Sequence, residues 1–152
     1  KKITCLTREF KRLLTLFNYK SKSKEFINIS MDNYLPVARK PFGEEKKNYD
    51  LRFDSSASDF IRCIWAYTCS LYLTSSKFDC NHPNLLIFDE PKQQDISITH
   101  FRNFLVELSE YTNAQVIVFA SFENSDKAFK EATEGLRFKL NYIDEKLVRP
   151  II

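Results

Sequence analysis

Glycine is scarce in this chain: Gly43 and Gly135 are the only two glycines among 152 residues. A phosphate-binding loop of the form GxxxxGK[ST] needs two glycines five positions apart, because the backbone must wrap closely around the phosphates. Gly43 and Gly135 are much too far apart to form such a loop. The sequence therefore excludes a nucleotide site built on a phosphate loop of its own.

The chain also lacks long apolar runs and a strong charge bias. No stretch of about 18 apolar residues occurs and nothing is typical of a signal peptide, so no membrane span is expected. The net charge is only +3, which predicts no global field that would attract nucleic acid. The hydrophobic content of 43% favours one folded domain with a core over a disordered chain.

The four cysteines show no CxxC spacing, and three of them lie among apolar residues. This pattern favours reduced core cysteines in a cytoplasmic protein over a disulfide framework. Cys80 and His82 form a lone Cys-x-His pair without a second pair, so a metal site is not expected there.

Hydrophobic periodicity predicts strands alternating with helices over the second half of the chain, which implies right-handed crossovers and a parallel sheet. Three short strands before residue 54 predict a small antiparallel portion. The predicted helices are 9–19, 57–75, 97–112 and 125–133. The predicted strands are 26–30, 34–38, 49–53, 85–88, 115–120 and 136–143.

The segment from Asn84 to Pro91 places four apolar residues directly before two adjacent carboxylates, Asp89 and Glu90. A short apolar run is typical of a strand buried on both faces, and proline ends the strand because it has no N–H to donate. Open α/β sheets bind their ligands at the carboxyl ends of such strands. The pattern predicts a Walker B segment, and a buried strand that ends in a polar turn is the alternative.

The helix predicted at 57–75 has a polar, serine-rich start. Ser56 and Asp59 have capping-box spacing, with the Ser56 hydroxyl accepting from the third helical N–H and Asp59 reaching back. This is either a well-made helix start or a phosphate site, since a helix N-terminus offers N–H groups and partial positive charge. The rest of the helix is apolar nearly all round, so we expect it to be deeply buried or held by a partner around Trp65.

In their order and spacing, the motifs between residues 50 and 121 resemble the carboxyl-terminal lobe of ABC-type ATPases. The most similar branch is the SMC-like ATPases of chromosome maintenance, DNA repair and phage defence. Arg62 stands six positions after Ser56, as an arginine often does in that family. The resemblance implies an α/β fold, a partial P-loop NTPase lobe with a mainly parallel sheet flanked by helices and a small antiparallel portion.

The resemblance also assigns roles to individual residues. It implies that Asp89 holds Mg²⁺ through water and that Glu90 is the catalytic carboxylate that activates the attacking water. Further residues are implied to contact ATP from the signature turn, the loop after Walker B and the switch position: Ser56, Ala57, Ser58, Asp59, Gln94 and Ser121.

Three motifs depart from the family pattern: the signature turn, the switch position and the loop after Walker B. The two signature glycines are replaced by Ala57 and Ser58, whose side chains hinder close approach of the backbone to a phosphate. Ser121 stands where the family has its switch histidine, and Asp95-Ile96 stands for the usual Leu-Asp of the loop.

In this family ATP is held between two heads, so each lobe contributes to two composite sites. The resemblance therefore implies ATP and Mg²⁺ as cofactors of the complete head. The implied partners are an amino-terminal lobe carrying Walker A, a second head in a homodimer and, as a further candidate, DNA. Because the residues that grip the phosphates are missing, and because the chain starts at Lys1 instead of methionine, we expect a fragment that is inactive alone. A divergent bacterial branch of the family would explain the altered motifs.

We expect a single domain over residues 1–152. Residues 1–20 are the end of a coiled-coil arm or a plain core helix, and residues 21–48 are short strands with a basic loop. Residues 49–143 form the core with the signature helix and the Walker B strand, and residues 144–152 form a tail.

Three other interpretations stay open. The altered signature favours a pseudo-ATPase or dimerisation lobe without turnover. The carboxylate pair suits a metal-dependent nuclease if a third acid lies nearby, for which the candidates are Asp79, Asp95 and Glu123. The basic loop 39–47 suits a nucleic-acid-binding module, with bases stacking on interleaved aromatic residues: Tyr34, Phe42 and Tyr49.

Overall fold

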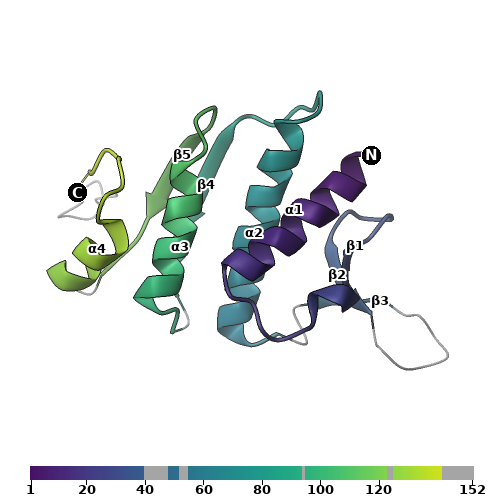
Figure 1. Ribbon diagram of the computed structural model, residues 1–152, viewed down its shortest axis with the longest axis horizontal. Coiled ribbons are helices and arrows are strands. Elements are labelled where there is room, and N and C mark those ends of the chain that lie inside the picture. The colour runs from purple at the N-terminus through teal and green to yellow at the C-terminus, as the bar shows by residue number, and fades with distance from the viewer. Residues whose placement is uncertain (40–47, 52–54, 94, 123–124, 142–152) are drawn as a thin grey trace, which may run out of the picture.

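The computed structural model describes residues 1–39, 48–51, 55–93, 95–122 and 125–141, and these form a mixed α/β protein (Figure 1). The helices are α1 (Lys2–Leu16), the short 3₁₀ helix η1 (Lys24–Phe26), α2 (Ala57–Ser75), α3 (Ile98–Ser109) and α4 (Asp126–Thr133). The strands are β1 (Ile27–Ile29), β2 (Pro36–Arg39), β3 (Asn48–Asp50), β4 (Leu85–Asp89) and β5 (Gln115–Phe119).

The strands form two separate sheets. One is antiparallel with the order β1-β2-β3, and its register pairs Ile27 with Ala38. The other is a parallel pair of β4 and β5, whose register runs from Leu85 opposite Gln115 to Asp89 opposite Phe119. The α/β class and the early antiparallel portion are confirmed, but among the described residues the parallel part is the smaller of the two sheets.

The core is aromatic and forms where α1, α2 and α3 meet the sheet pair. Trp65 of α2 stacks on Phe104 of α3 with ring centroids 4.3 Å apart and planes 18° apart. Phe17, just after α1, meets both rings edge-on at 5.8 and 5.7 Å, and Phe88 of β4 meets Phe104 edge-on at 4.9 Å. Because Trp65 is only 1% exposed, it adds no apolar surface, and the exposed apolar residues of α2 are instead Ile64 and Leu71.

Helix α1 begins and ends earlier than the predicted helix at 9–19. It stops because Asn18 adopts a left-handed backbone with φ of 59°, and the next N–H, from Tyr19, donates to the Leu14 carbonyl at 2.9 Å. A left-handed residue at this position is a common way to close a helix.

The side chain of Glu9 on α1 is a buried acceptor that ties the helices together. It lies within 3.1 Å of Arg8 and Arg12 on the same helix and within 2.8 Å of Lys77, which follows α2. Arg12 also reaches Glu107 of α3 at 2.7 Å. Burial raises the pKa of Glu9, but the three cationic donors outweigh burial and lower that pKa from 4.5 to about 2.

This low pKa predicts acid sensitivity. A carboxylate with a depressed folded-state pKa stabilises the fold above its unfolded value of 4.5, and that contribution is lost as pH falls towards 2. We expect Glu9→Gln to lower the free energy of unfolding at pH 7 by about 1–3 kcal/mol and to weaken its acid dependence. Urea titrations between pH 2.5 and 7 measure both effects. The exposed Glu25→Gln is the control, and equal acid dependence in both variants would contradict the assignment.

Two predictions about strands were wrong. No strand occurs over residues 136–141, the described part of the strand predicted at 136–143. Phe138 packs edge-on against Phe129 of α4 at 6.3 Å and is 52% exposed, so local packing takes the place of sheet pairing.

The second error concerns β4, which was expected to be buried on both faces. Its residues alternate between exposed and buried, because α3 covers one face only. Ile87 is 55% exposed and Phe119 of β5 is 41% exposed. The parallel pair therefore presents an apolar face that no described residue covers.

Two further sequence expectations concern cysteines and membrane spans. All four cysteines lie in the described ranges, where Cys5, Cys63 and Cys69 are buried and no disulfide forms. Burial raises the pKa of the Cys69 thiol to about 12, which keeps that group protonated. Within the described residues, no helix combines the length and apolar character needed to cross a bilayer.

Candidate functional site

Parallel pairing of β4 and β5 brings the carboxyl ends of both strands to one edge. Asp89 is the last residue of β4, and the backbone N–H of Glu90 still donates to the Phe119 carbonyl of β5 at 2.8 Å. Ser121 follows β5 after one further residue. Residues far apart in the sequence, Glu90 and Ser121, are therefore neighbours at the edge where α/β sheets bind ligands.

Two hydrogen bonds join these neighbours. The backbone N–H and the hydroxyl of Ser121 donate to Oε2 of Glu90 at 3.2 and 3.1 Å. Ser121 is exposed and Glu90 is half-buried, so the pair lies at the surface. The second carboxylate oxygen of Glu90, Oε1, accepts from no described residue, which leaves it available to orient a water molecule.

The backbone of Glu90 is strained. Pro91 disfavours a right-handed helical backbone at the preceding residue, and Glu90 adopts φ of 43°. A non-glycine residue in this region costs about 1–3 kcal/mol, and such strain is common at functional sites. The strain turns the chain sharply as it leaves β4, and the carboxylate of Glu90 meets Ser121.

The sequence predicts that Asp89, the last residue of β4, holds Mg²⁺ through water. Its side chain is exposed and has no hydrogen-bond or ion-pair partner among the described residues. Mg²⁺ keeps several of its waters and takes one or two protein carboxylates together with phosphate oxygens. An exposed carboxylate without a partner among the described residues is chemically able to take that role.

A metal site made by the protein alone has less support. Within the described ranges, no group of three or more His, Cys, Asp or Glu side chains lies close enough to hold a metal ion. Asp79 follows α2 and Asp95 follows β4, and neither joins Asp89 and Glu90 in such a group. Glu123, the remaining candidate third acid, lies outside the described residues.

The loop after β4 is described in part. Gln94 lies outside the described residues. Asp95 is exposed with φ of 57°, and Ile96 is buried in the core. Ser97 then caps α3 by accepting from the N–H of His100 at 3.3 Å. The loop is therefore anchored at its end, immediately before α3 begins.

The predicted signature turn forms the start of α2, whose bounds match the prediction at 57–75. The Ser56 hydroxyl caps the helix by accepting from the N–H of Asp59 at 3.2 Å. In the part of the chain that is described, the N–H groups of Ala57 and Ser58 donate to no acceptor. Helix N–H groups at the positive end of a 19-residue helix suit an anion.

The reciprocal half of the capping box was predicted wrongly. Asp59 does not reach back to the N–H of Ser56. Its Oδ2 accepts from the backbone of Lys20 at 2.9 Å and from the backbone and hydroxyl of Ser21 at 2.6 and 2.7 Å. The N–H of Ser56 donates to the Ser21 hydroxyl at 3.0 Å instead. The turn is thus held by the segment that joins α1 to η1.

Asp59 is buried and remains ionised. Burial raises its pKa, but hydrogen bonds from Ser21, Lys20 and Arg62 outweigh that effect and leave the pKa below the ordinary value of 3.8. The guanidinium of Arg62 donates to its Oδ1 at 2.6 Å. Asp59 therefore supports the turn from beneath, while Ser56 and Ala57 remain exposed to solvent.

Sequence reasoning missed His100 and Asn18. Nη2 of Arg62 lies 3.1 Å from Nδ1 of His100 on α3, and Nε2 of His100 lies 2.7 Å from the amide of Asn18. These contacts span 38 and 82 residues in sequence, so no local pattern indicates them. The six-residue spacing of Ser56 and Arg62 was the one available signal.

The two halves of the candidate site lie towards the same end of the molecule. In Figure 1 the N-termini of α2 and α3 both lie at the lower end of the view. The carboxyl ends of β4 and β5 point the same way, because α3 follows β4 in the opposite direction. No hydrogen bond or ion pair between described residues joins the Ser56 turn directly to Glu90.

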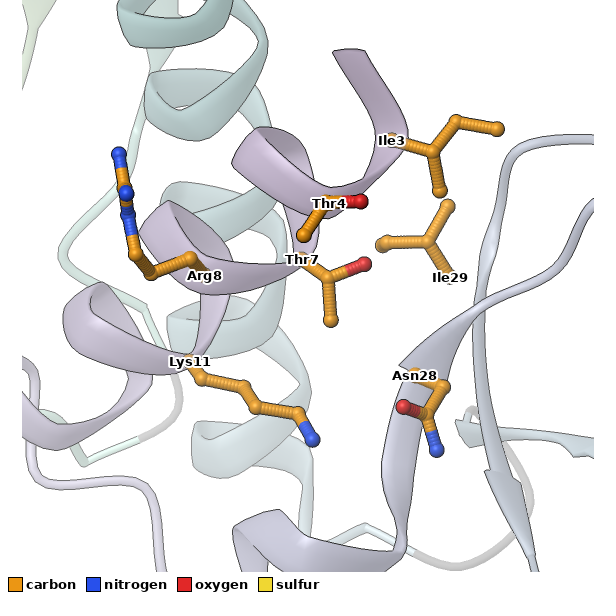
Figure 2. A pocket seen from close by; sticks show the side chains of 7 residues that line it. All are labelled: Ile3, Thr4, Thr7, Arg8, Lys11, Asn28 and Ile29. Atoms are coloured by element: carbon orange, nitrogen blue, oxygen red, sulfur yellow. The ribbon is translucent and has the colours of Figure 1, made fainter. Parts of the chain in front are cut away.

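A separate groove of about 580 Å³ lies between α1 and β1 (Figure 2). In Figure 2 the Lys11 side chain points across it towards Asn28. None of the predicted site residues lines this groove, so it is distinct from the carboxylate edge. Its lining residues are Ile3, Thr4, Thr7, Arg8, Lys11, Asn28 and Ile29.

Compared with known proteins, the sequence matches no family model and shows no significant similarity to a curated protein.

Proposed function

We propose that this chain is the carboxyl-terminal lobe of an SMC-like ABC-type ATPase head. In this proposal Asp89 and Glu90 serve one ATP site, and the Ser56 turn serves a second site on a partner head. The observation that carries the proposal is the carboxylate edge, where parallel pairing of β4 and β5 sets Glu90 beside Ser121.

The roles follow from the chemistry of each group. Asp89, exposed and unpartnered among the described residues, would bind Mg²⁺ through water. Glu90 would orient and deprotonate the attacking water, while Ser121 fixes one oxygen of its carboxylate. Ser121 would also read the state of the γ-phosphate, because a phosphate that competes for its hydroxyl would release Glu90.

The start of α2 supports the second half of the proposal. The N–H groups of Ala57 and Ser58, which donate to no described acceptor, and the helix dipole favour the phosphates of a nucleotide held by the other head. The side chains of Ala57 and Ser58 replace glycines, so the phosphate would sit farther from the backbone than in a glycine turn.

The open apolar face of β4 and β5 supports a further lobe as partner. Exposed apolar patches rimmed by polar residues mark interaction sites. A lobe carrying a phosphate loop would cover Ile87 and Phe119 and would bring ATP to Asp89 and Glu90. DNA maintenance, repair or phage defence is the proposed setting, with DNA as a further partner.

Mg²⁺-dependent phosphate release from ATP by the complete protein tests this function. We expect hydrolysis by the wild type and a loss of about 10²-fold or more in Asp89→Asn, because the metal would lose its carboxylate. Asp126→Asn at the exposed start of α4 is the matched control.

The other outcomes separate the alternatives. If the wild type does not hydrolyse ATP, either with DNA or without it, the result would favour a pseudo-ATPase or dimerisation lobe. DNA nicking that needs Mg²⁺ but ignores ATP would favour the nuclease interpretation.

A further inference from the structure

The side chain of His100 connects three elements that meet beneath the Ser56 turn. It projects from α3, contacts Arg62 of α2 through Nδ1 at 3.1 Å and contacts Asn18 after α1 through Nε2 at 2.7 Å. Arg62 is 8% exposed, and its Nε has no hydrogen-bond partner among the described residues. The buried guanidinium therefore depends on few acceptors, and His100 supplies one of them.

The chemistry of the donors fixes the tautomer of His100. A guanidinium only donates hydrogen bonds, so Nδ1 facing Arg62 must accept, and the ring proton must lie on Nε2. The structure places the amide nitrogen Nδ2 of Asn18 at 2.7 Å from Nε2, so this tautomer requires the Asn18 amide to be turned over, which brings its oxygen Oδ1 to the Nε2–H as acceptor. A protonated ring would direct an N–H at the cationic Arg62 and lose this contact.

From Arg62 the contacts continue to the Ser56 turn. Arg62 donates to Asp59 at 2.6 Å, and Asp59 accepts from the Ser21 hydroxyl at 2.7 Å. The Ser21 oxygen accepts from the N–H of Ser56 at 3.0 Å. Because Asn18 and Ser21 belong to one connecting segment, the contacts close into a ring that holds this segment at both ends.

We propose that His100 is a positioning residue for the Ser56 turn, and that it holds the turn only as a neutral imidazole with its proton on Nε2. Through Arg62 and Asp59 it keeps Ser21 in place beneath Ser56. Protonation of His100 removes one acceptor of Arg62 and opens the ring, which loosens the support of Ser21 beneath Ser56.

The charges around His100 favour the neutral ring. Burial lowers its pKa, and the facing cations Arg62 of α2 and Lys20 of the connecting segment lower it further, while Asp59 acts in the opposite direction. The contact of the neutral imidazole with Arg62 thus stabilises the fold above pH 6.5, the pKa of His100 in the unfolded chain. This stabilisation is lost as the pH falls through the lower pKa of His100 in the folded state. At neutral pH the turn is held.

For nucleotide binding, this inference rests on the proposed function. If the Ser56 turn contacts the nucleotide of a partner head, acidification weakens that contact through His100 without any change at Asp89 or Glu90. The hydrogen-bond ring itself requires no nucleotide, so it is tested on the 152-residue chain alone.

The experiment is a pH titration of the ¹⁵N-labelled chain by NMR, in which long-range spectra read both ring nitrogens. The chain has only two histidines, His82 and His100, so assignment is direct. We expect the Nε2–H tautomer at His100 and a titration midpoint below about 6.5. The backbone amide signals of Ser56 and Ser21 should shift with that same midpoint.

Three variants provide the controls. His100→Leu should show, at neutral pH, the Ser56 and Ser21 signals that the wild type reaches in acid. His100→Asn retains an acceptor near the Nδ1 position and should restore the neutral-pH signals without their pH dependence. His82→Gln, before β4, should leave the Ser56 titration unchanged.

Two results would overturn the inference: an Nδ1–H tautomer at His100, or a Ser56 amide that does not follow the His100 midpoint. The wild-type titration alone decides the matter if His100→Leu fails to fold. Loss of ATP hydrolysis in the complete protein would refute the proposed function and leave this ring intact, so the two failures are distinguishable.

Discussion

Glu90→Gln in the complete protein is expected to lower ATP hydrolysis by about 10²- to 10⁴-fold while nucleotide binding persists. Glutamine keeps the size of the side chain and an oxygen that can accept from Ser121, as Oε2 of Glu90 does at 3.1 Å. It cannot take a proton from water. Heads with bound ATP should therefore accumulate as dimers, which size-exclusion chromatography with ATP detects next to a phosphate-release assay.

Glu110→Gln, an exposed carboxylate at the end of α3, is the matched control and should retain wild-type turnover. A Ser121→Ala variant refines the assignment, because it removes the hydroxyl donor but leaves the backbone N–H that also holds Glu90. We expect a smaller loss for Ser121→Ala than for Glu90→Gln. Normal hydrolysis by Glu90→Gln would remove Glu90 from the catalytic role.

Local sequence signals were sufficient to predict the features that depend on residues close together in the sequence. Ser56 before an apolar run predicted the start of α2, and its hydroxyl does cap the helix through Asp59. Pro91 was expected to end the strand, and β4 ends at Asp89, two residues before it. A helix as long as α2, with 19 residues, is recognised from its own repeating periodicity without knowledge of distant contacts.

The features that the sequence did not predict depend on contacts between segments that are distant in the sequence. An apolar run gives the same pattern for one covered face as for two, so Leu85 to Phe88 could not reveal the open side of β4. Leu136, Phe138 and Leu140 alternate as a strand does, yet Phe138 packs on α4. Periodicity records which residues are apolar and carries no information on what covers them.

The candidate site likewise contains residues that local sequence predicts and contacts that it does not predict. Asp89 and Glu90 were identifiable because adjacent acids after an apolar run have a chemical reason to be there. The partnership of Glu90 with Ser121 needed the parallel register of β4 and β5, and the partnership of Arg62 with His100 needed three helices in place. Asp59 was expected to accept from the N–H of Ser56, but it accepts from Ser21 in the segment between α1 and η1.

Trp65→Ala is expected to destabilise the fold by about 3–5 kcal/mol, the second large effect. Trp65 is 1% exposed, stacks on Phe104 and meets Phe17 edge-on, so its removal leaves a cavity between α1, α2 and α3. Aromatic pairs of this geometry add about 0.5–1.5 kcal/mol to the burial of the ring itself. Urea unfolding at pH 7, followed by circular dichroism, measures the change in free energy.

The neighbouring variant Ile64→Ala is the control that distinguishes the loss of core packing from the general effect of placing an alanine in α2. Ile64 lies on the same helix but is 45% exposed, so its truncation should change stability by only about 0.5 kcal/mol. Phe104→Leu should fall between the two, because it removes the stacking partner of Trp65 and retains apolar volume. Equal losses for Trp65→Ala and Ile64→Ala would mean that α2 does not pack against α3 through this ring. The aromatic core that positions both Arg62 and His100 would then require a different arrangement.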